Sequence, residues 1–116
     1  MDARSLIATI LERCGAEVTA APSAAAACET LERLKPEVIV SDIGMPKEDG
    51  YSFIRSVRAR EAETQRKRTP GIALTAHPRA EDRVQALSAG YQAHIAKPVE
   101  PAELIAVIAS LTDGHV

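Results

Sequence analysis

The sequence predicts an α/β fold with a doubly wound parallel sheet. Three short apolar runs, 38–40, 72–74 and 93–96, have the composition of strands covered on both faces, and stretches with a helical period lie between them. Strands joined by connections of this length pair in parallel with right-handed crossovers, so helices cover both faces of the sheet. The length of 116 residues suits a single domain, 1–116, with a hydrophobic core of its own.

The N-terminal third of the chain contains two predicted helices. Apolar residues at helical spacing predict a helix over about residues 2–14, which ends at Gly15. The segment 16–21, "AEVTAA", weakly favours an extended conformation, and Pro22-Ser23 separates it from a second helix that ends before Pro36. The apolar face of this second helix consists of Ala24, Ala27, Cys28, Leu31 and Leu34.

In the rest of the chain each predicted strand is followed by a helix. After the first strand, the turn "PKEDG" leads into a helix that begins near Tyr51 and precedes a charged loop closed by Pro70-Gly71. After the second, "PRAEDRVQALSAG" predicts a helix with acidic residues in its first half and a glycine stop. After the third, Pro101 begins a helix whose apolar face is Leu104, Ile105, Val107, Ile108 and Leu111.

Composition and charge argue against several classes of function. The formal net charge of −2 gives no basic field for nucleic acid or anionic lipid, and the basic run 66–68 is expected to be a solvated loop. No apolar run reaches the roughly 18 residues of a membrane span, so we expect a cytoplasmic protein without membrane contact. Cys14 and Cys28 lie on apolar helix faces without metal-ligand spacing, and we expect buried free thiols.

Three polar residues, Asp42, Thr75 and Lys97, stand at the carboxyl ends of the predicted strands. In doubly wound sheets the reaction site lies beyond this edge, so the three should converge. An aspartate can attack phosphorus to form an acyl phosphate, while a lysine and a threonine can contact the phosphoryl oxygens. Taken singly, each residue also has a purely structural interpretation. Asp42 could cap a turn, Thr75 could bond to the local backbone, and Lys97 could be a solvated charge. Their common position favours the phosphoryl site.

The segments "VIVSDIGMPKEDGYSFI" and "IALTAHPRAEDRVQALSAGYQAHIAKPVEPAEL" resemble the receiver domain of two-component response regulators. The resemblance covers essentially the whole chain, and Asp-x-x-Met-Pro with a later Thr-Ala and Lys-Pro is a specific combination. The amino-acid sequence of these segments is most similar to receivers at the C-terminus of hybrid histidine kinases. The resemblance implies a flavodoxin-like receiver fold and a phosphoacceptor domain that at most catalyses its own phosphoryl transfer and dephosphorylation.

The resemblance also assigns roles to individual residues. It implies that Asp42 is the phosphoacceptor, Thr75 the switch hydroxyl and Lys97 the ammonium that contacts the phosphate. Asp42 and the backbone carbonyl of Gly44 would bind Mg²⁺, and the Lys97-Pro98 peptide bond would be cis. The phosphoryl donor would be a histidine kinase or a histidine phosphotransfer protein.

The chain departs from the receiver pattern at its start. Receivers open with an apolar strand that ends in an adjacent acidic pair, and this chain begins at the approach to the helix that follows that strand. Asp2 is interpreted as a helix N-cap or first-turn acid. Asp42, Gly44 and water are a thin ligand set for Mg²⁺, so we expect weak metal binding and slow or lost phosphorylation.

Without the first strand, the sheet has a gap beside the run 38–41. The segment 17–21 could pair directly with that run, a segment could be exchanged within a dimer, or a partner could add a strand. Our hypothesis is a homodimer.

Histidines occupy two positions of interest. His94 stands where receivers usually have an aromatic residue that turns inward on phosphorylation, and it either takes that switching role or is a partly buried histidine without one. His77 follows Thr75-Ala76 and is expected to be exposed, and His115 belongs to the C-terminal tail.

Three functional classes are consistent with these observations to different degrees. The first is a phosphorelay receiver, and the second is a receiver-like interaction or dimerisation module that works without phosphorylation. The third is a phosphatase with Asp42 as nucleophile, which is disfavoured because Gly44 stands where a general acid would be needed.

Overall fold

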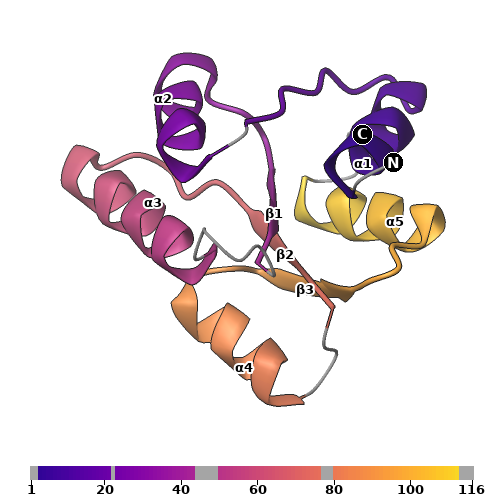
Figure 1. Ribbon diagram of the computed structural model, residues 1–116. Coiled ribbons are helices and arrows are strands. Elements are labelled where there is room, and N and C mark those ends of the chain that lie inside the picture. The colour runs from indigo at the N-terminus through magenta and orange to yellow at the C-terminus, as the bar shows by residue number, and fades with distance from the viewer. Residues whose placement is uncertain (1–2, 22, 44–49, 77–79, 113–116) are drawn as a thin grey trace.

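The computed structural model describes residues 3–21, 23–43, 50–76 and 80–112, in which helices and strands alternate (Figure 1). The predicted helices and strands are present in this part of the chain, and their predicted ends are met within two residues. The elements are α1 (Ala3–Arg13), α2 (Ala24–Leu34), β1 (Ile39–Asp42), α3 (Gly50–Thr64), β2 (Gly71–Thr75), α4 (Ala80–Ala89), β3 (Ala93–Ala96) and α5 (Pro101–Leu111).

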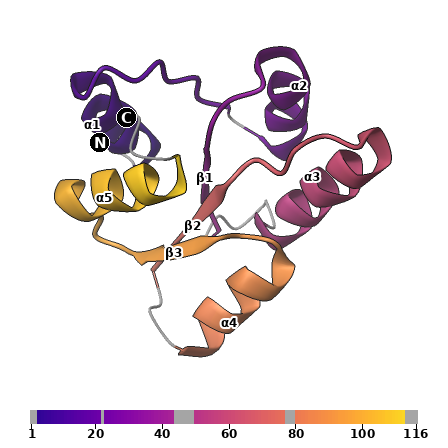
Figure 2. The same ribbon diagram turned by 180° about the vertical axis from the view of Figure 1, so that it is seen from behind.

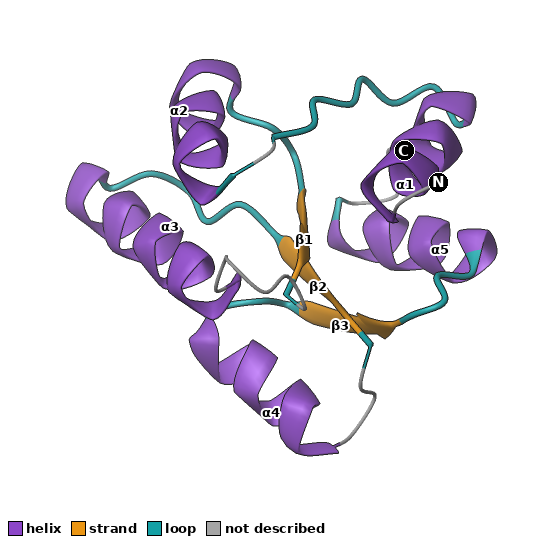
Figure 3. Ribbon diagram, viewed as in Figure 1, coloured by secondary structure: helices purple, strands orange, loops and turns teal. Residues whose placement is uncertain are grey.

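The strands of the described residues form one parallel sheet in the order β1-β2-β3 (Figure 3). The register places Asp42 opposite Leu74 and Thr75 opposite Ala96, so the three strands end at one edge. All five residues of β2 are buried, whereas β1 is mostly half-buried. This difference follows from the central position of β2, which has a neighbour on each side.

Helices cover both faces of the sheet, as the doubly wound prediction requires. In the two opposite views, α1 and α5 lie on one face and α2, α3 and α4 on the other (Figures 1 and 2). Ile72 and Leu74 of β2 pack toward α1 and α5, and Ala73 packs toward the other face. The alternation follows from the two-residue period of a strand, which sends successive side chains to opposite faces.

Local signals in the sequence account for the helix ends. The Ser23 side chain accepts a hydrogen bond from Ala26 N at 3.1 Å and caps α2. At the other end of α2, Lys35 adopts a left-handed conformation with φ of 49° and its N–H bonds to Leu31 O. Gly15, with φ of 90°, follows α1 as predicted.

The segment 16–21 has no regular secondary structure in the described residues, so direct pairing of 17–21 with the run 38–41, one of three alternatives left open, is not observed. Its backbone leaves the end of α1 through a bond from Ala16 N to Leu11 O at 3.1 Å. Ala16 and Val18 then pack against the core cluster formed with α1 and α5. Burial of these side chains on the helices, rather than a ladder with β1, decides the path of the segment.

Two further expectations concern the surface. Cys14 and Cys28 are free, but they are half-buried rather than buried. The basic run 66–68 is exposed, as predicted. Among the described residues no helix is long and apolar enough to cross a membrane.

Candidate functional site

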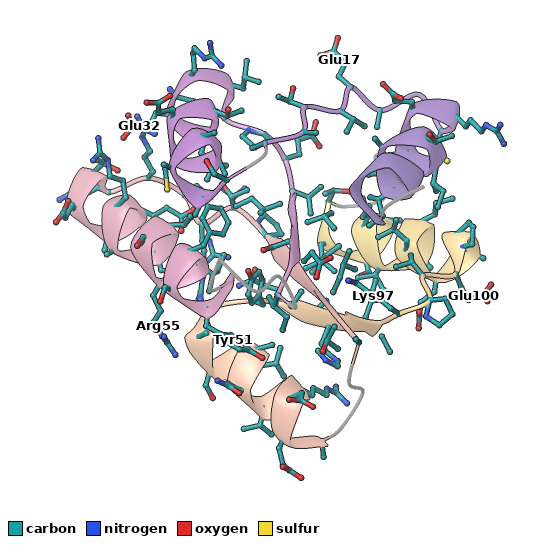
Figure 4. All side chains as sticks on the ribbon, viewed as in Figure 1. Glu17, Glu32, Tyr51, Arg55, Lys97 and Glu100 are labelled. Carbon is teal, nitrogen blue, oxygen red and sulfur yellow. The ribbon has the colours of Figure 1, made fainter. Side chains whose placement is uncertain are left out.

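The carboxyl edge of the sheet brings together two charged side chains that are far apart in the sequence. Asp42 ends β1, and Lys97 directly follows β3, between that strand and α5 (Figure 4). Lys97 Nζ donates a hydrogen bond to Asp42 Oδ2 at 2.6 Å. Because β2 lies between the two strands, they are roughly 10 Å apart, and the Lys97 and Asp42 side chains together reach across the end of β2.

The pair is open to solvent on one side. The Lys97 side chain is 29% exposed and the Asp42 side chain 25%. A charge pair with this exposure contributes little to stability, so its value to the protein lies in the chemistry of the carboxylate. A reacting molecule can reach the carboxylate and would meet the ammonium group beside it.

Thr75 lies at the end of the central strand, between the two. It is 5% exposed, and its backbone carbonyl accepts a hydrogen bond from Lys97 N at 2.7 Å. This bond fixes the start of the lysine side chain relative to β2. The strand ends therefore place Asp42, Thr75 and Lys97 along one edge, and the side chains of Asp42 and Lys97 are in contact across it.

Comparison with known families accounts for this arrangement. The sequence pattern of the response regulator receiver domain matches residues 1–109. The chain belongs to the response regulator receiver domain family. The resemblance inferred from its motifs is thereby confirmed, and receiver domains are signalling modules of two-component systems rather than conventional enzymes.

Curated relatives include free-standing proteins and parts of much longer ones. A 14.6 kDa protein of Leptolyngbya boryana is 45% identical over 108 residues, which are 92% of this chain and 79% of that protein. The sensor protein GacS of Pseudomonas syringae is 33% identical over 107 residues, which are 92% of this chain and 12% of GacS. A hybrid histidine kinase of Dictyostelium discoideum is 44% identical over 82 residues, 70% of this chain and 5% of that kinase.

Solved receiver structures confirm the flavodoxin-like fold. A response regulator of Chloroflexus aurantiacus superposes with a TM-score of 0.84 at 26% identity, over 94% of this chain and 87% of that one. The receiver domain of a sensor histidine kinase from Pseudomonas aeruginosa, described with magnesium in its active-site cleft, gives 0.80 at 34% identity, over 94% and 87%.

The described residues of this receiver domain do not by themselves make up a magnesium site. Asp42 is a carboxylate already paired with an ammonium group, and the described residues contain no group of three or more His, Cys, Asp or Glu side chains that could hold a metal. Mg²⁺ requires six ligands in near-octahedral geometry. Gly44, whose carbonyl is the other expected ligand, lies outside the described residues.

His94 lies on β3, half-buried, on the face that α4 covers. Its neighbour Ile95 packs toward α1 and α5, so the strand period directs His94 to the opposite face. Its Nε2 atom is buried without a hydrogen-bond partner in the described structure. An imidazole nitrogen in this state destabilises the conformation that buries it, which fits either sequence-based interpretation of His94.

Other residues named from the sequence have simpler outcomes. The Lys97-Pro98 peptide bond is cis. Asp2, His77 and His115 lie outside the described residues.

Sequence reasoning missed a polar network that joins α3 to the connection between α4 and β3. Arg58 Nε donates to Gly90 O at 2.9 Å, and its terminal nitrogens donate to Gln92 Oε1 at 2.9 Å and Glu61 Oε1 at 2.7 Å. Gln92 Oε1 also accepts from Gly71 N at 2.6 Å. Glu61 is three residues away on the same helix, but Gly90 and Gln92 are 32 and 34 residues away from Arg58, so no spacing in the sequence indicates these two partners.

Proposed function

We propose that Asp42 accepts a phosphoryl group from a histidine kinase or a histidine phosphotransfer protein. The observation that carries the proposal is the 2.6 Å contact between Lys97 Nζ and Asp42 Oδ2 at the carboxyl edge of a receiver domain. The contact puts a fixed positive charge beside a carboxylate that solvent reaches.

The transfer needs little covalent chemistry from the protein. A carboxylate oxygen of Asp42 attacks the phosphorus of a phosphohistidine, a P–O bond forms, the P–N bond breaks, and the neutral imidazole leaves after taking a proton. Lys97 stabilises the charge on the phosphoryl oxygens as they approach Asp42. Thr75 ends the neighbouring strand and is the residue we assign to contact a phosphoryl oxygen of the product.

Magnesium dependence should be unusual in this 116-residue chain. Lys97 engages the Asp42 carboxylate, and the described residues contain no group of three or more His, Cys, Asp or Glu side chains, so we infer weak binding of Mg²⁺ and slow phosphoryl uptake. A titration of uptake rate against Mg²⁺ would then fail to saturate at metal concentrations that saturate ordinary sites.

The direct test is incubation with acetyl phosphate and Mg²⁺ followed by intact mass. We expect a gain of one phosphoryl group that Asp42→Ala abolishes. Glu103→Gln, at an exposed acid of α5, is the matched control and should retain the gain. A protein that gains no phosphoryl group at millimolar Mg²⁺ would contradict the proposal.

A second candidate is an interaction module that dimerises without phosphorylation. The observation in its favour is β1, which pairs with β2 on one edge and with no other described strand. A second copy that adds or exchanges a strand at this edge would extend the sheet beyond β1. Light scattering should then give the mass of a dimer, and a folded monomer at micromolar concentration would sink this candidate.

We place the phosphorelay function in the cytoplasm and without direct contact to nucleic acid. The support for the second point is charge, since the formal net charge is −2 and Arg60 is paired with Glu32. The support for the first is that no helix of the described residues is long and apolar enough to cross a membrane.

A further inference from the structure

Tyr91 is a buried polar residue that the proposed function leaves without a task. It is 2% exposed and packs in the cluster between the sheet and the helices α2, α3 and α4. Its hydroxyl donates a buried hydrogen bond to the carbonyl of Gly50 at 2.8 Å. A buried tyrosine needs a partner for its hydroxyl, and here the partner is the first residue of α3, 41 positions away in the sequence.

The backbone around Tyr91 is tied to two other elements. Tyr91 N donates to Ala86 O of α4 at 3.1 Å, and Gln92 N donates to Gly71 O of β2 at 2.9 Å. The end of α4 lies beside α3 in both views (Figures 1 and 2). These bonds fix the backbone of Tyr91 relative to α4 and β2. The Tyr91 hydroxyl therefore limits where Gly50 can lie.

Gly50 in turn lies against the residue that follows Asp42. A Cβ atom at Gly50 would be 2.5 Å from Ile43 Cγ2 and 3.0 Å from Ile43 Cα, so the two backbones approach closely. Ile43 N donates to Leu74 O at 3.0 Å, which continues the strand ladder past Asp42. A contact path thus runs from Tyr91 through Gly50 and Ile43 to Asp42.

We propose that Tyr91 is a positioning residue for phosphoryl transfer to Asp42, acting through Gly50 and Ile43. The proposal rests on the proposed function of Asp42. The hydrogen bond from the Tyr91 hydroxyl to Gly50 O holds the start of α3 against Ile43. This contact keeps the Asp42 carboxylate at its place on the sheet edge. Phosphoryl transfer depends on alignment of the attacking oxygen, so a small shift of Asp42 slows the reaction even in a fully folded protein.

The test compares Tyr91→Phe with Thr112→Val. The first removes the hydroxyl and keeps the ring, and the second removes a hydroxyl bonded to Ile108 O at 2.8 Å, at the end of α5. Each variant is measured in three ways: rate of phosphoryl uptake from acetyl phosphate, thermal midpoint, and backbone amide resonances of Asp42, Ile43 and Gly50. For Tyr91→Phe we expect roughly three- to tenfold slower uptake and shifted amide resonances at these positions. Thr112→Val should change neither the uptake rate nor the amide resonances of Asp42, Ile43 and Gly50.

The outcomes separate this inference from the proposed function. If Tyr91→Phe takes up phosphate at the parent rate and leaves the three amide resonances in place, Tyr91 has no positioning role. If uptake in both variants falls in proportion to the thermal midpoint, the effect is one of stability and the inference is again overturned. A parent protein that takes up no phosphate refutes the proposed function, and the amide resonances then decide: shifts at Asp42 and Ile43 support the positioning role, and their absence refutes it.

Discussion

The ion pair between Lys97 and Asp42 is closely held although it contributes little to the stability of the fold. The Lys97 side chain is 29% exposed and the Asp42 side chain 25%, so water screens their attraction. The lysine nevertheless crosses the central strand to reach the carboxylate at 2.6 Å. A contact that contributes little to folding and is held at hydrogen-bond distance is suited to the chemistry of Asp42.

Replacement of Lys97 should therefore separate activity from stability. We expect Lys97→Met to slow phosphoryl uptake by about 10- to 100-fold, because the charge that stabilises the phosphoryl oxygens is lost. The free energy of unfolding should change by less than about 1 kcal/mol, as for other exposed pairs. Uptake rates by intact mass and urea unfolding check both parts. Arg55→Met, at an exposed cation of α3 (Figure 4), is the control, and equal uptake in both variants would refute a role for Lys97.

Cys28 is a residue whose titration the fold alters. Burial raises the pKa of its thiol, the charge of Glu32 raises it further, and Arg60 opposes them. Because the folded state holds the proton more tightly than the unfolded chain, it gains stability below the unfolded pKa, and this gain is lost as pH rises through the folded pKa.

In a Cys14→Ser background, iodoacetamide should react with Cys28 more slowly in the folded protein than in urea. The cause is that the thiolate is the reacting form and less of it is present near pH 8.5, roughly the ordinary thiol pKa. The difference in rate should shrink as pH rises. Equal rates in folded and unfolded protein near that pH would show that the fold does not perturb this thiol.

At the scale of elements, the start of α3 packs closely against the end of β1 because Gly50 has no side chain. Gly50→Ala would place a methyl group 2.5 Å from Ile43 Cγ2 and 3.0 Å from the Ile43 backbone. We expect a loss of about 1–3 kcal/mol in the free energy of unfolding, together with slower phosphoryl uptake, because Ile43 must move and Asp42 is its neighbour.

Gly15→Ala is the matched comparison for that variant. Gly15 has φ of 90° and nothing within 4 Å of its Cβ position, so alanine there is strained without a clash. It should cost about 1–2 kcal/mol while uptake by the folded protein stays at the parent rate. If both variants slow uptake equally, the close approach of Gly50 to Ile43 is not what positions Asp42.

The contact between α3 and the strand-entry loop at 90–92 depends on Arg58. We expect Arg58→Met to lower the free energy of unfolding by about 2 kcal/mol, because bonds from a charged donor to Gly90 O and Gln92 Oε1 are lost in a partly buried place. Arg60→Met, which breaks an exposed pair with Glu32, should cost less than about 0.5 kcal/mol. Urea unfolding of both variants measures the difference, and equal losses would mean that the Arg58 network is no more than a surface pair.

At the scale of the whole molecule, the sheet should open unevenly. β2 is paired on both sides and fully buried, so its amides should exchange most slowly with deuterium. Among the described strands β1 pairs with β2 alone, so it should exchange faster at low protein concentration. If a second copy covers its edge, protection of 39–42 will rise with concentration, and protection equal to that of β2 at every concentration would contradict the uneven sheet.

Much of this fold could be predicted because its determinants are local. The apolar runs, Gly15, Ser23, Pro36 and Pro101 act within a few residues of where they stand, and the helices and strands follow them. The path of the segment 16–21 is not predictable in this way, because Val18 packs against the core cluster of α1 and α5 and its position depends on contacts with distant residues. Family membership could also be predicted, because the motifs Asp-x-x-Met-Pro, Thr-Ala and Lys-Pro are local, and the receiver domain match over residues 1–109 confirms it.

The sequence by itself determined the order of the elements, the parallel sheet and the residues that stand at its carboxyl edge. The tertiary structure decided which of them touch. The 2.6 Å contact of Lys97 with Asp42 spans 55 residues, the Arg58 network spans more than 30, and the bond from Tyr91 to Gly50 spans 41. Contacts of this kind form only when strands and helices pack together. Their partners are decided by distance in space, and no periodicity along the sequence indicates which residues will meet.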